Sequence, residues 1–412
     1  MSELKIDGSR LRRSLMELAR IGATEKGGVR RLALSDLDRQ GRELTREWFD
    51  EAGLKITVDR IGNIFARRAG ADPSLPPVVS GSHIDTQPSG GKFDGNYGVM
   101  AALEVVRTLN DTGTRTLAPF EIAIWTNEEG SRFVPVMMGS GVFAGAFSLE
   151  HAMTQRDADG VSVGEALRAI GYAGDEFVGG RSFAAYYEAH IEQGPILEDL
   201  GHTVGVVTGA LGLRWYDLVL SGQDSHAGPT PMRLRRDALL GAARIVDRVN
   251  QIALTRQPGA RATVGFMQVL PNSRNVVPGT VRMSVDLRHP TEAGLDDMEA
   301  ALRTLVQAVG EECAVEADLN RVTSYAPVRF DASCIEAVRQ ASERLGYSHS
   351  DIVSGAGHDA CYVARVAPTG MIFVPCEGGI SHNEIENAKP EDLEAGCNVL
   401  LHAVLASAGT VD

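Results

Sequence analysis

The sequence lacks the features that would place the protein in a membrane or on a nucleic acid. It contains no run of about 18 apolar residues, the length that a membrane-spanning helix needs. It has no surplus of basic residues, and its formal charge of −14 argues against nucleic acid or an anionic membrane surface as a partner. Residues 1–5 lack the charged-then-apolar pattern of a secretory signal peptide.

Cysteine is also scarce, and its spacing excludes a disulfide framework. The five cysteines are odd in number and form no C-x-x-C pair, which predicts a reducing, cytoplasmic location. Apolar residues make up 43% of the chain and charged residues 23%, as in soluble globular proteins. A chain of 412 residues is too long for one ordinary core, so we expect two domains.

The alternation of apolar strands and helices predicts an α/β domain. A short strand runs into His83, a helix follows Asp94, and residues 120–125 form a second apolar strand. A strand, a helix and a strand within about 45 residues make a βαβ unit, which favours a mostly parallel sheet covered on both faces. Residues 186–191 and 371–374 are further apolar strands. Helices are predicted at residues 9–21, 36–52, 332–345 and 391–407, and a hairpin at 55–60 and 63–66.

A different pattern interrupts this domain near Gly212. Predicted strands at residues 213–220, 263–269, 281–287 and 314–324 alternate with helices at 235–250 and 292–310. The order βαββαβ indicates a ferredoxin-like α+β layer. We therefore predict a catalytic domain formed by residues 1–211 and 329–412, with a lid domain inserted at 212–328. An open sheet edge and a surface helix in such a layer often pair with a second copy, which predicts a homodimer through the inserted domain.

The segment around His83 contains the first candidate metal ligand. In an extended strand end, His83 and Asp85 point to the same side, because side chains alternate along a strand. His83 could then bind a metal ion while Asp85 orients its imidazole from behind. A His-x-Asp pair alone is weak evidence, so the interpretation depends on further ligand-type residues.

Metal-type side chains follow several predicted strands of the first domain, where sites form in open α/β sheets. They are His83 with Asp94, Glu128 with Glu129, His190, and His382. Each segment by itself fits a polar surface loop better than a site, and only their coincidence favours a metal centre. Histidines and carboxylates without a thiolate favour zinc first and manganese next. Five ligands suit two ions about 3.5–4 Å apart that share one carboxylate.

The adjacent residues Glu128 and Glu129 are predicted to have different roles. Neighbouring side chains in an extended strand end point apart, so both are not expected to bind metal. One should be a ligand and the other should act as a general base toward the attacking water.

These motifs resemble a known family. His83-Ile84-Asp85-Thr86, Gly91-Lys92-Phe93-Asp94-Gly95, Asn127-Glu128-Glu129-Gly130 and Gly379-Ile380-Ser381-His382 are similar to the di-metal amidohydrolases of the aminoacylase and carboxypeptidase clan. Segments 188–194, 224–228 and 272–278 extend the resemblance to the branch of N-carbamoyl-L-amino-acid hydrolases, β-ureidopropionases and allantoate amidohydrolases. His190 favours this branch, because peptidase and deacylase relatives tend to have a carboxylate at that position.

The resemblance implies a role for each motif residue. One divalent ion is expected on His83 and His190, a second on Glu129 and His382, and Asp94 should bridge the two ions. Asp85 should support His83, and Glu128 should be the general base that later protonates the leaving nitrogen.

The resemblance also implies residues that contact the substrate. His226 should stabilise the oxyanion from the partner subunit, although on the residues alone a surface histidine is the better interpretation. Arg288 should bind the substrate carboxylate, for which a planar guanidinium is suited. The remaining expected substrate-binding residues are Gln193, Asn275 and Arg214.

The implied reaction is hydrolysis of the carbamoyl amide bond of an N-carbamoyl-L-amino acid, giving the amino acid, ammonia and carbon dioxide. N-carbamoyl-β-alanine is an alternative substrate, since residues 86–88 and 91–92 resemble the β-ureidopropionases, and allantoate is another. A remote alternative is a non-catalytic metal-binding scaffold. Glu128 argues against it, because such a protein has no need of a base beside a ligand.

Overall fold

The computed structural model describes residues 4–411, and the chain divides into two compact units. Met1–Gly209 and Arg329–Asp412 form unit 1, and Ala210–Val328 form unit 2. The second boundary coincides with the predicted one at residue 328, and the first lies at residue 209 instead of 211. Unit 2 is therefore an insertion into unit 1 along the chain.

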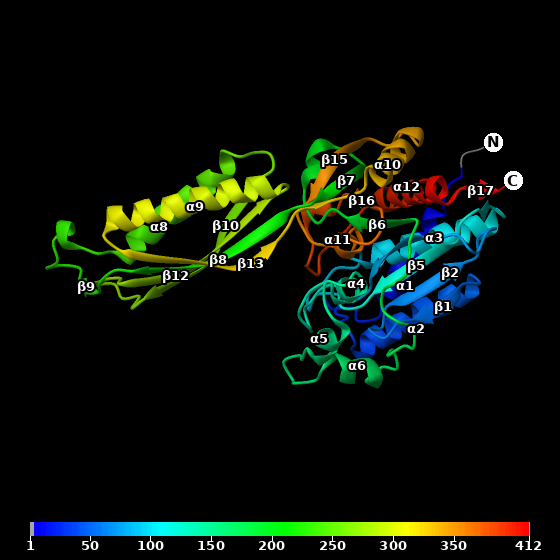
Figure 1. Ribbon diagram of the computed structural model, residues 1–412, viewed down its shortest axis with the longest axis horizontal. Coiled ribbons are helices and arrows are strands. Elements are labelled where there is room, and N and C mark those ends of the chain that lie inside the picture. The colour runs from blue at the N-terminus through cyan, green and yellow to red at the C-terminus, as the bar shows by residue number, and fades with distance from the viewer. Residues whose placement is uncertain (1–3, 412) are drawn as a thin grey trace. The chain divides into compact units, whose positions relative to one another are not determined.

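The core of unit 1 is a mixed sheet whose centre is parallel. Its nine strands within residues 4–411 follow the order β1-β2-β5-β3-β6-β16-β7-β14, with β15 beside β7 (Figure 1). The strands are β1 (Lys55–Val58), β2 (Ile64–Arg68), β3 (Val78–His83), β5 (Phe120–Trp125), β6 (Ala185–Ile191), β7 (Val204–Ala210), β14 (Val328–Arg329), β15 (His349–Ser354) and β16 (Thr369–Val374). The pairs β3–β5, β3–β6 and β6–β16 are parallel, whereas β1–β2, β2–β5 and β7–β16 are antiparallel. Every residue of β3, β5, β6 and β16 is buried, as expected for parallel strands covered on both faces.

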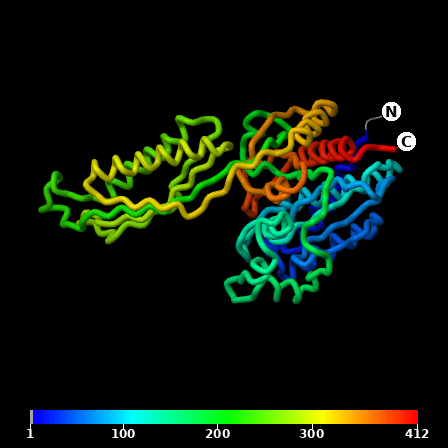
Figure 2. The backbone as a smooth tube through the Cα atoms, in the orientation of Figure 1, coloured from blue at the N-terminus to red at the C-terminus, as the bar shows by residue number. Residues whose placement is uncertain are grey.

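The long helices of unit 1 include segments from both ends of the chain. They are α1 (Gly8–Leu18), α2 (Asp36–Glu51), α3 (Asn96–Asp111), α10 (Ala332–Arg344) and α12 (Pro390–Ala408). The last helix, α12, packs against α1 and α3, so the returning segment completes the fold begun by the first one (Figure 2). The predicted start of α2 is confirmed, because the Ser35 side chain accepts a hydrogen bond from the main-chain nitrogen of Asp38.

Several elements of unit 1 were not predicted as such. Strands β7 and β15 were missed because β7 contains glycine and β15 mixes polar and apolar residues, so neither has a clear apolar pattern. The segment between β5 and β6 contains three short helices, α4 (Met138–Phe143), α5 (Leu149–Thr154) and α6 (Val163–Ala169). Two more short helices are α7 (Ile196–Leu200) and α11 (Asp359–Val363).

Unit 2 has the predicted βαββαβ order of its main elements. These are β8 (Gly212–Ser221), α8 (Ala238–Leu254), β10 (Arg261–Leu270), β12 (Thr280–His289), α9 (Glu292–Cys313) and β13 (Glu316–Tyr325). The strands form an antiparallel sheet in the order β10-β12-β8-β13. Buried and more exposed residues alternate along β8, because both helices contact the sheet and cover one of its faces. A second, two-stranded ribbon pairs β9 (Ser225–His226) with β11 (Val276–Val277).

Among residues 4–411, no helix combines the length and the apolar composition that crossing a bilayer requires.

Candidate metal centre

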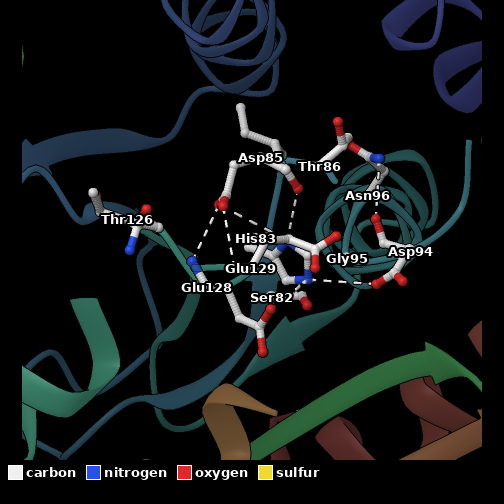
Figure 3. Close-up of polar contacts among 12 residues, drawn as sticks. Ser82, His83, Asp85, Thr86, Asp94, Gly95, Asn96, Thr126, Glu128 and Glu129 are labelled. Carbon is white, nitrogen blue, oxygen red and sulfur yellow. Dashed lines mark hydrogen bonds and ion pairs between the residues drawn. The ribbon is translucent and has the colours of Figure 1, made fainter. Parts of the chain in front are cut away.

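His83, the last residue of β3, has one ring nitrogen anchored and the other directed at carboxylates. Its Nδ1 lies 2.9 Å from the main-chain oxygen of Asp85, to which it can donate (Figure 3). Its Nε2 lies 3.6 Å from Asp94 Oδ1 and 3.5 Å from Glu128 Oε2. Gly95 packs directly on this ring, and a Cβ at that position would come within 2.4 Å of Nε2. With Nδ1 protonated, the Nε2 lone pair is available to a cation.

Asp85 differs from the sequence-based expectation. Its carboxylate Oδ1 is 3.9 Å from His83 Nδ1, so the main-chain carbonyl of Asp85, not its carboxylate, makes the close contact with the imidazole. The carboxylate accepts hydrogen bonds from the main-chain nitrogens of Glu128, at 3.3 Å, and Glu129, at 3.2 Å (Figure 3). The reason is that β3 ends at His83, so the alternation of side chains along a strand no longer applies at residue 85.

Asp94, just before α3, lies between two groups of ligand-type side chains. Its Oδ1 is 3.2 Å from His190 Nε2, in addition to the contact with His83. Its Oδ2 is 3.3 Å from His382 Nε2, and the same nitrogen is 3.3 Å from Glu129 Oε2. These side chains form two groups of three, and the potential ligand atoms within each group lie within 4.8 Å of one another. The first group is His83, Asp94 and His190, and the second is Asp94, Glu129 and His382. Asp94 therefore belongs to both groups.

His190 has the same arrangement as His83. Its Nδ1 lies 2.9 Å from the main-chain oxygen of Ile191, and its Nε2 accepts a hydrogen bond from the Gly95 nitrogen at 3.2 Å. Both imidazoles thus direct Nε2 toward Asp94. Two nitrogens of this kind beside a shared carboxylate are a donor set that fits a divalent cation such as zinc or manganese.

Glu128 and Glu129 diverge, as the pair was predicted to do. The Glu129 carboxylate faces His382, whereas the Glu128 carboxylate lies beside His83 and belongs to neither group of three among the described residues. The Gln87 side chain holds Glu129 by donating from Nε2 to Oε2 at 2.6 Å, a contact that no sequence signal indicated.

Burial and mutual repulsion shift the pKa values of this cluster. Burial raises the pKa of Glu129 to about 7, and the charge of Asp94 adds to the shift. Burial likewise raises the pKa of Glu128 well above its ordinary value. Burial acts in the same direction on Asp94, but its contacts with His190, His382 and His83 prevail and hold its pKa well below the usual range. Carboxylates this close are stabilised by a cation between them, which supports the fit to metal.

A third group of ligand-type residues, Glu188, His190 and His358, lies close together but is already engaged. Glu188 accepts hydrogen bonds from Ser82 Oγ at 2.6 Å and from the Ala360 nitrogen at 2.9 Å. His358 Nε2 is 3.0 Å from Ser354 Oγ, and its ring packs on that of His190 with the centroids 4.5 Å apart. We infer that this group supports His190 from behind.

Of the predicted substrate-binding residues, Gln193 lies in unit 1, beside the carboxylate of Asp94. Its Nε2 donates to Asp94 Oδ2 at 2.8 Å, and the residue adopts a left-handed backbone conformation with φ of 59°. This position beside the shared carboxylate keeps Gln193 a candidate for contacting a substrate at the metal centre.

Arg31 is a buried positioning residue that sequence reasoning missed. Its guanidinium donates from Nε to the Ile84 oxygen at 2.8 Å and from Nη2 to Asn96 Oδ1 at 2.5 Å. It therefore ties the segment after His83 to the beginning of α3. Burial lowers its pKa to about 10, so it remains cationic at neutral pH. Arg31 lies in the irregular segment between α1 and α2, where no sequence pattern reveals such contacts.

The other predicted substrate-binding residues lie in unit 2. His226 is exposed on β9, and its Nδ1 accepts from the Gly228 nitrogen at 3.1 Å. Asn275 Oδ1 lies 3.2 Å from Ser273 Oγ. Arg288, on β12, contacts Asp286 Oδ2 through Nη2 at 2.9 Å.

Arg214 has a different environment from the one expected of a substrate-binding residue. Its side chain is only 4% exposed and pairs with Asp296 at 2.7 Å, Glu299 at 2.8 Å and Glu292, all on α9. A guanidinium surrounded by these carboxylates stabilises the contact between β8 and α9. We therefore leave Arg214 out of the proposed substrate site.

Comparisons against known proteins give the family of the chain and agree with its fold. The chain belongs to the peptidase family M20/M25/M40, whose model matches residues 79–406 and so includes every candidate ligand. It is 50% identical over 408 residues to an N-carbamoyl-L-amino-acid amidohydrolase of Rhizobium meliloti, covering 99% of this chain and 98% of the relative. An enzyme of the same name from Geobacillus stearothermophilus is 39% identical over 408 residues, covering 97% and 98%.

A solved structure extends the comparison to the fold. The amidase of the hydantoinase/carbamoylase family from Burkholderia multivorans superimposes with a TM-score of 0.97 at 60% identity, covering 98% of each chain. The predicted α/β fold class, the hydrolase assignment and the predicted family branch are confirmed by these matches.

Proposed function

We propose that the protein hydrolyses the carbamoyl amide bond of N-carbamoyl-L-amino acids, releasing the amino acid, ammonia and carbon dioxide. The observation that carries this proposal is the position of Asp94 between His83 and His190 on one side and Glu129 and His382 on the other. The similarity to enzymes named for this reaction gives the substrate class.

Two divalent ions, zinc or manganese, are proposed to occupy the centre. His83, His190 and Asp94 would hold the first ion, and Asp94, Glu129 and His382 the second. Such ions, when bound, polarise a carbonyl oxygen and lower the pKa of a water molecule. The buried carboxylates of the cluster supply the negative charge that retains the ions.

Glu128 is proposed as the general base. Its carboxylate lies 3.5 Å from His83 Nε2, outside both groups of three, so it is free to accept a proton from the attacking water. Burial raises its pKa well above the ordinary value of a glutamate, which suits a group that must both accept and release a proton. The same carboxyl group would then donate the proton to the leaving nitrogen.

Residues of unit 2 are proposed to bind the rest of the substrate. Arg288 would contact the carboxylate, Asn275 the amide end together with Gln193, and His226 of a second copy the oxyanion. We propose a homodimer that pairs through unit 2. Its edge strand β10 supports this, because Phe266, Met267 and Leu270 are 55%, 39% and 42% exposed on it. A cytoplasmic location is proposed because all five cysteines are free.

A substrate panel tests the function. Purified protein loaded with zinc or manganese is offered N-carbamoyl-L-amino acids, N-carbamoyl-β-alanine and allantoate, and ammonia release is measured. We expect the highest kcat/KM on the N-carbamoyl-L-amino acids. A preference for N-carbamoyl-β-alanine or allantoate would overturn the substrate class. The absence of ammonia release from every compound would overturn the reaction itself.

A further inference from the structure

Glu386 is a buried carboxylate that the proposed reaction does not use. It is 1% exposed and lies after His382 in the chain. Its Oε1 accepts hydrogen bonds from the main-chain nitrogens of Phe93, at 2.9 Å, and Asp94, at 3.2 Å. Its Oε2 accepts from Ser381 Oγ at 2.9 Å. One side chain therefore contacts both the turn that presents Asp94 and the segment that presents His382.

Ser381 extends this connection to the shared carboxylate itself. Its Oγ lies 2.9 Å from Asp94 Oδ2 as well as 2.9 Å from Glu386 Oε2. Asp94 is thus held at its backbone by Glu386, and its Oδ2 lies within hydrogen-bond distance of the same Ser381 hydroxyl, whose single proton the two carboxyl groups share. This Oδ2 is the oxygen that lies 3.3 Å from His382 Nε2.

Gly91 shows that the turn closes tightly around this carboxylate. A Cβ at Gly91 would lie 2.0 Å from Cδ and Oε1 of Glu386, too close for any side chain. Gly91 is not among the residues with positive φ, so its backbone conformation does not require glycine. The space taken by the Glu386 carboxylate is therefore the reason that a glycine fits here.

We propose that Glu386 is a positioning residue that sets Asp94 against His382 and so determines how tightly the second metal position binds. This inference rests on the proposed metal centre. A glutamine keeps an acceptor oxygen for the two main-chain N–H groups but turns an NH2 group toward Ser381 Oγ, so Ser381 can no longer donate to residue 386 and the contact that links it to Asp94 changes. Glu386 holds two segments that each present a proposed ligand of the second ion, Asp94 and His382. Its benefit should therefore show in metal binding.

The test compares Glu386→Gln with Glu384→Gln, a matched change in the same segment. Glu384 pairs with the exposed Lys26 at 3.5 Å and has no contact with Asp94. For each protein we would measure the two metal affinities by titration into chelator-treated protein, and the melting temperature without metal. We expect Glu386→Gln to weaken the second ion about 10–100-fold, as loss of a partner behind a ligand commonly does. The first affinity and the metal-free melting temperature should change little, and Glu384→Gln should match the wild type.

Gly91→Ala provides an independent variant. Its added methyl group must displace the Glu386 carboxylate, so it should weaken the same ion, and the double variant should be no worse than Glu386→Gln alone. Wild-type affinity for both ions in Glu386→Gln would overturn the proposal. A fall in the metal-free melting temperature without a change in affinity would do so too, because it would make Glu386 a structural residue. A wild-type protein that binds two ions yet hydrolyses no ureido acid would overturn the proposed function and leave this inference standing.

Discussion

The carboxylate of Asp85 lies 3.2 Å from the main-chain nitrogen of Glu129 and accepts its hydrogen bond. The carboxylate also accepts from Glu128, so the residue that follows β3 fixes the turn that follows β5. Two neighbouring parallel strands therefore present their metal-type side chains at a set distance. The general base and a ligand depend on this connection for their positions.

Replacing Asp85 with asparagine tests the connection. The amide retains one acceptor but directs its NH2 group at a main-chain N–H, so the turn carrying Glu128 should shift. We expect kcat/KM to fall about 10–100-fold. The affinity of the ion at His83 should hardly change, because the main-chain oxygen of residue 85 still contacts the imidazole. Asp72→Asn, in an exposed turn of the same unit, is the control. A loss of affinity for the ion at His83 without a loss of kcat/KM would instead indicate that the carboxylate orients His83.

Replacing Glu128 with glutamine should remove the general base and little else. The side chain keeps its size and lies outside both ligand groups, so the bound metal measured by elemental analysis should equal that of the wild type. Turnover should fall by about 10²–10⁴-fold, the usual contribution of a positioned proton acceptor. Substantial remaining activity would assign proton transfer to another group.

Removal of metal should abolish activity and reduce stability together. Without cations the buried carboxylates of Asp94, Glu128 and Glu129 repel one another, so the chelator-treated protein should melt at a lower temperature. Ion added at about 100 times its dissociation constant should restore roughly 2.7 kcal/mol of stability per site. Ammonia release and calorimetry measure the two effects. Full activity after exhaustive chelation would contradict the metal centre.

Arg214 and Arg288 should respond differently to the same substitution. Arg214→Lys breaks a buried network with α9, so the melting temperature should fall while KM stays constant. Arg288→Lys loses a planar donor pair proposed for the substrate, so KM should rise about 10–100-fold with little change in melting temperature. Steady-state kinetics and thermal unfolding on both variants provide the comparison. The reverse pattern would return Arg214 to the substrate site.

Asp59 should make the metal-free protein less stable as the pH rises. Burial raises its pKa to about 7, although hydrogen bonds from Asn63 oppose the shift. In the unfolded chain its pKa is about 3.9. The folded state therefore binds the extra proton, and the stability that this proton contributes is lost as the pH rises through 7. In chemical denaturation, the free energy of unfolding of the wild type relative to Asp59→Asn should fall by on the order of 2–3 kcal/mol between pH 5 and pH 8. A constant difference would mean that Asp59 is ionised throughout.

The pattern of apolar residues along the chain predicted a strand or helix correctly wherever that pattern is clear. The helix after Asp94 and the strand at 120–125 were predicted because each is strongly apolar, and the strand into His83 was predicted from Val78 and Val79 alone. The same reasoning did not find β7 or β15, which lack such a pattern and are strands only because β16 and β7 offer them partners.

The sequence by itself determined which side chains are available for a metal centre, because His83, Asp94, Glu129, His190 and His382 each stand at or beyond the end of a predicted strand. Only the tertiary structure decided what holds those side chains. Three contacts join segments that are remote along the chain. They are the hydrogen bond of the Asp85 carboxylate to Glu129, that of Arg31 to Asn96, and that of Glu386 to the main-chain nitrogen of Asp94. Periodicity describes the neighbours of a residue within one element. A hydrogen bond to another element depends on where the folded backbone places that element, and no local pattern contains that information.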